Sequence, residues 1–291
     1  MLDVATSDLF QRALARDSEG LLDQAVADYE AVLRKAPEYA PAWLNLSAAY
    51  RRQRRWDDSL RCALRAGKAE PTNLAAWRNA GIASTALSQW DEARIAWSAC
   101  GIELPEGEGV LEMELGPIGI RLGSEPGAEI VWCTSIDPCR AVIGNVPSPE
   151  SGRSWGDVLL HDAELVEERV FGPHTLPVYT ELAVLEPSGI STVRAWVIAS
   201  SPGDAQDLSD FFDAHDACAE DWTPDGMDAG PMSVVESTTS ALLDWLPDRE
   251  FGIAASLEEA EDLLEEWSRA SSGRLVFAVE VTEKPEPPRL G

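Results

Sequence analysis

Three histidines and five cysteines are the side chains of this sequence best suited to acid–base, nucleophilic or metal chemistry. His161 and Asp162 follow an expected strand, a place where a catalytic pair could lie, and His174 is expected on a loop. His215 shares the apolar face of an expected helix with Phe211, which is typical of a packed core histidine. A metal site would need further ligands at a recognisable spacing, and the sequence offers none. The histidines therefore identify no reaction.

The cysteines are odd in number and scattered, without a Cys-x-x-Cys pair, so reduced thiols in a cytosolic protein are the simplest interpretation. A Gly-x-Ser-x-Gly elbow and a phosphate-binding Gly-rich loop are absent, and Gly116 and Gly119 are spaced wrongly for a dinucleotide fingerprint. No apolar run is long enough to span a membrane, and no secretory signal is evident. We expect a cytoplasmic protein without cofactor, metal or catalytic residues. The five cysteines are Cys62, Cys100, Cys133, Cys139 and Cys218.

The first third of the chain repeats itself every 34 residues, as Pro37, Pro71 and Pro105 show. A period of this length is typical of a stacked unit of secondary structure that covers its apolar face against the next copy. The same interval separates Asp23, Asp57 and Asp91; Leu22, Trp56 and Trp90; Ala42-Trp43 and Ala76-Trp77; and Asn45 and Asn79.

Each copy is expected to form two amphipathic helices. In the second copy, apolar residues recur at steps of three and four from Ala42 to Tyr50, and again from Trp56 to Leu64. This is the spacing of one helical face. A proline closes each unit because it cannot continue the helix.

These copies resemble the tetratricopeptide repeat over about residues 6–105. Trp43 and Trp77 take the early Trp of the family, and the three prolines take its terminal Pro. The first copy departs from the pattern, with Leu9 in place of the Trp and Arg16 in place of the Tyr, which suits a terminal cap. An ordinary bundle with the same spacing is the alternative. The resemblance implies a concave groove, lined by the first helix of each pair, that receives an extended or helical peptide.

One subset of the family grips a C-terminal carboxylate in that groove, but Phe10, Leu44 and Arg78 do not match its Lys positions. Arg51 and Arg52, at the end of a first helix, are better candidates for contact with a partner, although a solvated arginine cluster accounts for them equally well. The partner-binding residues that we predict are Leu44, Asn45, Ala48, Arg51, Arg52, Arg78, Asn79, Ile82, Thr85 and Ala86.

Charge divides the chain into two parts. Residues 1–105 carry 13 basic and 14 acidic side chains, whereas residues 106–291 carry 10 basic and 37 acidic ones, a net of −27. Such a field repels nucleic acid and anionic membranes and attracts basic surfaces. Solubility alone is the alternative explanation.

Residues 106–284 are expected to form an acidic α+β domain, because short β-rich runs separated by Gly, Pro and Ser clusters follow Pro105. These runs predict a mostly antiparallel sheet or small barrel. Two helices follow, one from Asp204 to about Glu220 and one that begins with the capping box of Ser256 and Glu259. Strands on both sides of the second helix give a strand–helix–strand unit, and residues 285–291 are expected to be a loose tail. The predicted strands are 110–122, 129–134, 140–146, 157–160, 178–185, 192–200, 251–255 and 275–281.

Three functions fit this pattern. The first is a non-catalytic adaptor whose helical array binds a protein or peptide. The second is an acidic inhibitor or immunity-type protein that neutralises a basic partner, and the third is an enzyme with its site near His161 or His174. A further hypothesis is that the arginine-rich second repeat docks the acidic half of the same chain. The abundance of Ala, Arg, Asp and Glu is typical of a GC-rich bacterial genome.

Overall fold

The computed structural model describes residues 2–123, 127–171, 174–223 and 245–282, apart from the side chains of residues 171 and 174. These residues form two compact units. The first unit holds the residues up to 115 together with two later segments, 135–140 and 160–163. The second unit holds the other described residues. The tail predicted for residues 285–291 lies outside the described residues.

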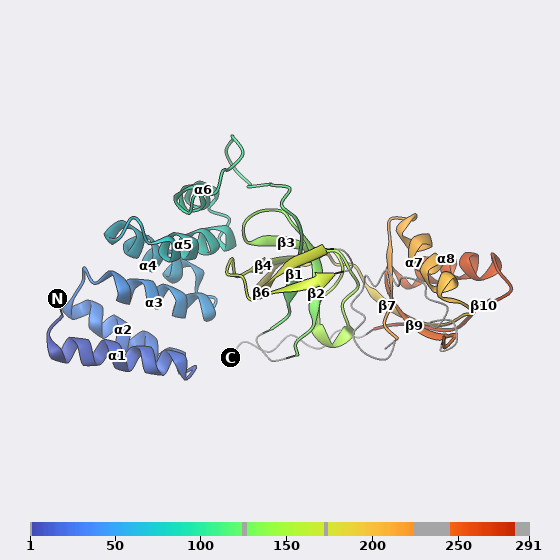
Figure 1. The fold of residues 1–291 in the computed structure, drawn as a ribbon, viewed down its shortest axis with the longest axis horizontal. Coiled ribbons are helices and arrows are strands. Elements are labelled where there is room, and N and C mark those ends of the chain that lie inside the picture. The colour runs from blue at the N-terminus through green and yellow to red at the C-terminus, as the bar shows by residue number, and fades with distance from the viewer. Residues whose placement is uncertain (1, 124–126, 172–173, 224–244, 283–291) are drawn as a thin grey trace. The chain divides into compact units, whose positions relative to one another are not determined.

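Six helices make up the helical part of the first unit, as the repeats predict (Figure 1). They pair as three consecutive hairpins, and the first helices of neighbouring hairpins also contact one another. The tetratricopeptide-like array expected from the sequence is thus confirmed. The helices are α1 (Val4–Ser18), α2 (Leu22–Lys35), α3 (Ala40–Arg52), α4 (Trp56–Ala69), α5 (Leu74–Ala86) and α6 (Trp90–Ala99).

The turn inside each hairpin has the same backbone form in all three repeats. Gly20, Arg54 and Ser88 each have a positive φ, of 76°, 57° and 56° respectively, and lie 34 residues apart. In each repeat the N–H group of the residue after this position bonds back to a carbonyl five residues earlier, as Arg55 does to Tyr50 at 2.9 Å. This is the Schellman arrangement, which usually places glycine at the left-handed position. Only the first repeat has glycine there.

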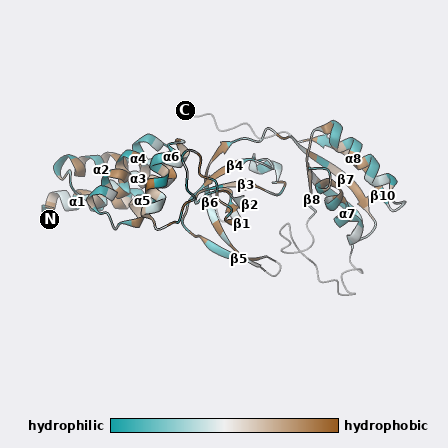
Figure 2. Ribbon diagram, turned by 90° about the horizontal axis from the view of Figure 1, so that it is seen from above, coloured by the Kyte–Doolittle hydropathy of each residue, from teal (hydrophilic) through white to brown (hydrophobic). Residues whose placement is uncertain are grey.

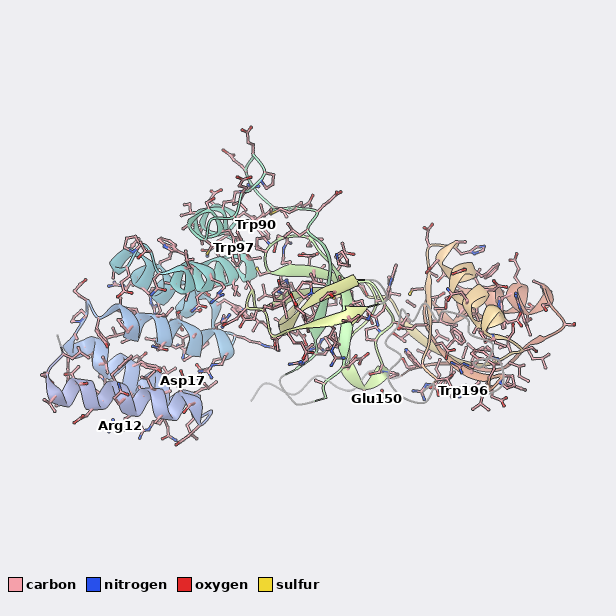
Figure 3. All side chains as sticks on the ribbon, viewed as in Figure 1. Arg12, Asp17, Trp90, Trp97, Glu150 and Trp196 are labelled. Atoms are coloured by element: carbon pink, nitrogen blue, oxygen red, sulfur yellow. The ribbon has the colours of Figure 1, made fainter. Side chains whose placement is uncertain are left out.

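Tryptophans connect the hairpins. The indole N–H of Trp43 donates to the carbonyl of Pro37 at 2.7 Å, and that of Trp77 donates to the carbonyl of Pro71 at 2.9 Å. Trp97, labelled on α6 in Figure 3, is fully buried, and a Cβ placed on Gly81 would lie 2.6 Å from its ring. The glycine therefore allows α5 and α6 to approach closely.

A closed five-stranded barrel follows the helices in the chain, and most of its residues belong to the second unit. Its strands follow the order β1-β2-β3-β4-β6, and β1 pairs with β6 in parallel to complete the ring. A sixth strand, β5, extends from β6 as an antiparallel edge. The strands are β1 (Gly116–Arg121), β2 (Ile130–Ser135), β3 (Arg140–Ile143), β4 (Val158–His161), β5 (Glu167–Phe171) and β6 (His174–Glu186), with a 3-10 turn at Pro149–Ser151.

The rest of the second unit is a four-stranded antiparallel sheet with two helices on one face (Figure 1). Two strand–helix–strand units, β7-α7-β8 and β9-α8-β10, follow each other in the chain. Their strands interleave in the sheet, whose order is β10-β7-β9-β8. This is the ferredoxin-like topology. Its elements are β7 (Thr192–Ala199), α7 (Pro202–Asp213), β8 (Cys218–Asp221), β9 (Asp248–Ala254), α8 (Leu257–Arg269) and β10 (Arg274–Val281).

The core of this sheet lies under the helices, where Phe212, Phe251, Leu264 and Trp267 are almost fully buried. The predicted capping box of Ser256 and Glu259 is present at the start of α8.

One expectation about these elements is wrong, and one strand has no counterpart among the predicted strands. The helix predicted to reach Glu220 ends at Asp213, because Asp216 turns the chain with a φ of 57° and residues 218–221 pair with β9. The sequence also gave no sign of β5, whose Glu-Glu-Arg run lacks the alternation of a half-buried strand.

Candidate functional site

The ends of the first helices carry equivalent residues 34 positions apart: Asp17, Arg51 and Thr85. All three are held by contacts inside the first unit. Asp17 receives the guanidinium of Arg52 in an ion pair and the phenol of Tyr29 at 3.1 Å. The other two contact the segments that join this unit from beyond residue 115.

Arg51 pairs with Asp162. Its Nη1 lies 2.9 Å from Asp162 Oδ1, and the exposed fractions of the two side chains are only 12% and 20%. The residue before Asp162, His161, is buried, and its backbone N–H donates to the carbonyl of Cys139 at 2.8 Å. Burial lowers the pKa of His161, which favours the neutral ring. Arg51 and Asp162 thus form an ion pair that is shielded from most of the solvent.

A second polar cluster surrounds Arg140, which is 5% exposed. Its Nε donates to Asp137 at 2.6 Å and its Nη2 donates to the carbonyl of Leu111 at 2.8 Å. The guanidinium also lies 4.7 Å from the ring centre of Trp90, at the start of α6, in a cation–π contact. The other oxygen of Asp137 accepts the backbone N–H groups of Cys139 and Arg140, at 2.8 and 2.7 Å. Every charged group of this cluster is thus paired.

Cys139 lies between these two contacts, with no exposed surface. Burial raises the pKa of its thiol well above the usual value, and the charge of Asp137 raises it further, against a hydrogen bond with Thr85. Thr85 also lies 3.4 Å from the indole nitrogen of Trp97. Thr85, near the end of α5, thus contacts both Cys139 and Trp97.

Of the ten predicted partner-binding residues, three are buried, one is held in an ion pair and six are at least partly accessible to solvent. Asn79, Ile82 and Thr85 are buried, and the contact role predicted for them does not fit this burial. Asn79 donates to Ser47 Oγ at 2.9 Å and so joins α5 to α3, an architectural role. Arg51 is occupied by Asp162. Solvent reaches the other six at least in part: Leu44, Asn45, Ala48, Arg52, Arg78 and Ala86.

The arginines of the second repeat are mostly engaged close by. Arg55 and Arg61 both pair with Asp58, and Arg65 lies over the ring of Trp43. Among the pairs that the structure describes for this repeat, the one between Arg51 and Asp162 brings in a carboxylate from beyond residue 105. The wider docking of the acidic half on this cluster stays a prediction.

Burial also bears on the groups considered for catalysis. Burial raises the pKa of every thiol described, to about 12 for Cys62 and Cys218, so none of them is poised as a thiolate. The prediction that His215 is a core residue is wrong. His215 follows α7 and is exposed, and its ring lies 4.5 Å from that of Phe211. His174 begins β6, and its side chain lies outside the described residues.

In the second unit, Glu220 has a carboxyl group whose pKa is raised by burial. Glu220 Oε2 accepts the side-chain amide of Asn145 at 3.1 Å and the backbone N–H of Val146 at 2.9 Å. Burial raises the pKa of Glu220 to about 7, and the charges of Glu129 and Asp221 act in the same direction. This group links the loop after β3 to β8 of the ferredoxin-like sheet.

The part of the chain that the structure describes contains no group of three or more His, Cys, Asp or Glu side chains able to hold a metal ion. None of the helices in that part has the length and apolar character needed to cross a bilayer.

No family model matches the chain, and no curated protein matches it in sequence. Solved structures resemble about a third of it. The TPR2B domain of yeast Sti1, in a complex with an Hsp70 peptide, is 17% identical with a TM-score of 0.32 and covers 34% of this chain and 78% of that one. The first TPR of RPAP3, bound to the HSP90 peptide SRMEEVD, is 19% identical with a TM-score of 0.32 and covers 33% and 75%. The Sgt2 TPR domain from Aspergillus fumigatus is 20% identical with a TM-score of 0.32 and covers 34% and 65%. The assignment of the helical part rests on its own repeat geometry.

Proposed function

We propose that this protein is a non-catalytic adaptor whose helical array binds a polypeptide partner along α3. The observation that carries this proposal is a stripe of α3 that its neighbours leave uncovered. Although α3 contacts α1, α4 and α5, Leu44, Asn45 and Ala48 keep part of their surface accessible and Arg52 is exposed. The opposite side of the same helix, with Ala42, Leu46, Ala49 and Tyr50, is buried.

The accessible stripe combines apolar surface with hydrogen-bonding groups. Leu44 and Ala48 lie one helical turn apart, which is the spacing at which a partner chain meets successive apolar side chains. Arg52 keeps an exposed fraction of 42% beside its ion pair with Asp17, so part of the guanidinium remains open to a partner. Asn79, Ile82 and Thr85 are buried and do not belong to this surface. The proposed binding surface therefore covers the second repeat and the start of the third.

Site-directed photo-crosslinking tests the proposal. A photoreactive residue at Ala48 of the full chain should form adducts with a specific protein in an extract of the native host. The matched control is Lys68, which is exposed on the second helix of the same repeat. Adducts should then be lost when Leu44→Glu is added to the Ala48 probe. Equal yields at positions 48 and 68, or no effect of Leu44→Glu, would contradict binding along α3.

A further inference from the structure

The strand β10 forms one edge of the ferredoxin-like sheet. It pairs with β7 from Arg274 opposite Ala199 to Val281 opposite Val193, with a shift of register at Phe277, between Val276 and Ala278. No strand in the described part of the chain pairs with its other edge. The backbone N–H and C=O groups on that side are therefore available for another strand.

The side chains of this strand are unusually apolar for an edge. Leu275, Phe277 and Val281 have exposed fractions of 53%, 61% and 48%. Between Arg274 and the end of the strand, Glu280 is the one charged residue. An exposed apolar edge of this kind attracts other strands unless a partner covers it.

Another edge strand of the second unit, β5, has a different composition. It too has a strongly exposed apolar residue, Val170, at 79%. However, its neighbours Glu167 and Arg169 form an ion pair at 2.9 Å, and Glu167 also pairs with Arg121 at 2.9 Å. Charged side chains are a common protection of an edge against unwanted pairing. The edge of β10 lacks that protection.

Helix α8 lies over β10 and adds a strong negative charge. Its buried side, with Ala260, Leu264 and Trp267, packs on the sheet, and its outer side is hydrophilic (Figure 2). Arg269 is the one cation of α8, and it pairs with Glu265. Arg274, at the start of β10, turns towards α7 and pairs with Asp204 and Asp207 at 2.8 and 2.6 Å. Among the described residues, the exposed carboxylates of α8 outside the capping box and the ion pair with Arg269 are Glu258, Glu261, Asp262 and Glu266.

We propose that the outer edge of β10 binds an extended segment of a partner protein in which basic and apolar residues alternate. The segment adds a fifth strand to the sheet. Its apolar side chains cover Leu275 and Phe277, and its Lys or Arg side chains meet the carboxylates of α8. A basic partner is favoured over a second copy of this chain, because pairing two β10 edges would bring two acidic α8 helices together.

An octapeptide of alternating Lys and Val, blocked at both ends and labelled with a fluorophore, is a suitable probe for the full-length protein. We expect saturable binding that weakens as salt rises, and slower amide hydrogen exchange in residues 275–281. Two peptides serve as controls: one with Glu in place of Lys, and one N-methylated at alternate amides so that it cannot donate along one edge. Both should fail to bind.

Matched variants locate the site. Phe277→Lys should weaken binding about fivefold, since a like charge then faces the peptide, whereas Val170→Lys on β5 should not. Asp262→Lys on α8 should also weaken binding, and Asp210→Lys on α7 should have less effect. All four positions are at the surface, and circular dichroism checks their folding.

Three results would overturn the proposal. Equal losses in Phe277→Lys and Val170→Lys would indicate non-specific attraction. Concentration-dependent protection of β10 without peptide would assign the edge to a second copy. Protection that disappears when residues 283–291 are deleted would assign it to this chain's own end.

Discussion

Arg51 and Asp162 form an ion pair in which both side chains are largely shielded from solvent. Replacing one member leaves the other charge partly buried without its partner. We expect Arg51→Met to lower the free energy of unfolding by about 1–3 kcal/mol. The comparison is Arg61→Met, since Arg61 pairs with Asp58 but is 63% exposed, and should cost about 0.5 kcal/mol or less. Urea unfolding of the full chain measures both, and equal effects would show that the pair with Asp162 is not stabilising.

The left-handed turn residues of the second and third repeats predict stabilising substitutions. Arg54 and Ser88 adopt a backbone conformation that costs an ordinary residue roughly 1 kcal/mol relative to glycine. We therefore expect Arg54→Gly and Ser88→Gly each to raise the stability by about 0.5–1 kcal/mol. Gly20→Ala should have the opposite sign. Thermal unfolding checks the three variants together, and a destabilising Arg54→Gly would mean that the contacts of the arginine side chain outweigh backbone strain.

Close packing at two glycines predicts which of two Gly→Ala substitutions destabilises the protein more. A Cβ at Gly81 would lie 2.6 Å from the buried ring of Trp97, whereas one at Gly67 would lie 3.0 Å from the ring of Trp77. We expect Gly81→Ala to destabilise the array by about 1–3 kcal/mol and Gly67→Ala to destabilise it less. Chemical unfolding followed by tryptophan fluorescence gives both values. The reverse order would indicate that α6 moves away from α5 more easily than the packing suggests.

Glu220 predicts a pH dependence of stability. Its pKa in the folded protein is raised to about 7, above its value in an unfolded chain, so the folded state holds the proton more tightly. Below the unfolded pKa both states are protonated and the group has no effect. As pH rises from about 4.5 to 7 the unfolded state ionises first, so the free energy of unfolding should fall by about 3 kcal/mol and level off above pH 7.

Glu220→Gln should remove this fall, while Glu266→Gln, at an exposed position of α8, should leave it. Unfolding midpoints at pH 5.5 and pH 8 are sufficient for the comparison. A Glu220→Gln variant with the same change in stability between the two pH values as the wild-type protein would contradict the raised pKa.

The sequence predicts those parts of the fold that have a local pattern. The array is visible because each repeat must present the same apolar residues to its neighbour, which fixes Trp43, Trp77 and the three prolines at one interval. The capping box of α8 is likewise local. By contrast, α7 ends before His215 because Asp216 adopts a left-handed conformation, which the continuing apolar spacing does not reveal.

The contacts at the ends of α3 and α5 could not be predicted. Asp162, Cys139 and Arg140 lie 50 or more residues along the chain from Arg51, Thr85 and Trp90, the residues of the helices that they contact. Their sequence offers no motif. The burial of Ile82 and Thr85 has the same origin in tertiary packing, since their helical spacing is also that of a groove surface. The ferredoxin-like sheet order depends on long-range pairing in the same way.

The chain enters the first unit three times, with residues up to 115, with 135–140 and with 160–163. A module that can be exchanged between proteins usually has both of its ends in a linker. Here a single cut after α6 would remove Cys139, Arg140 and Asp162 from the helices that they contact. A recombination event that transplanted the helices alone would therefore leave Arg51 without Asp162 and Trp90 without Arg140.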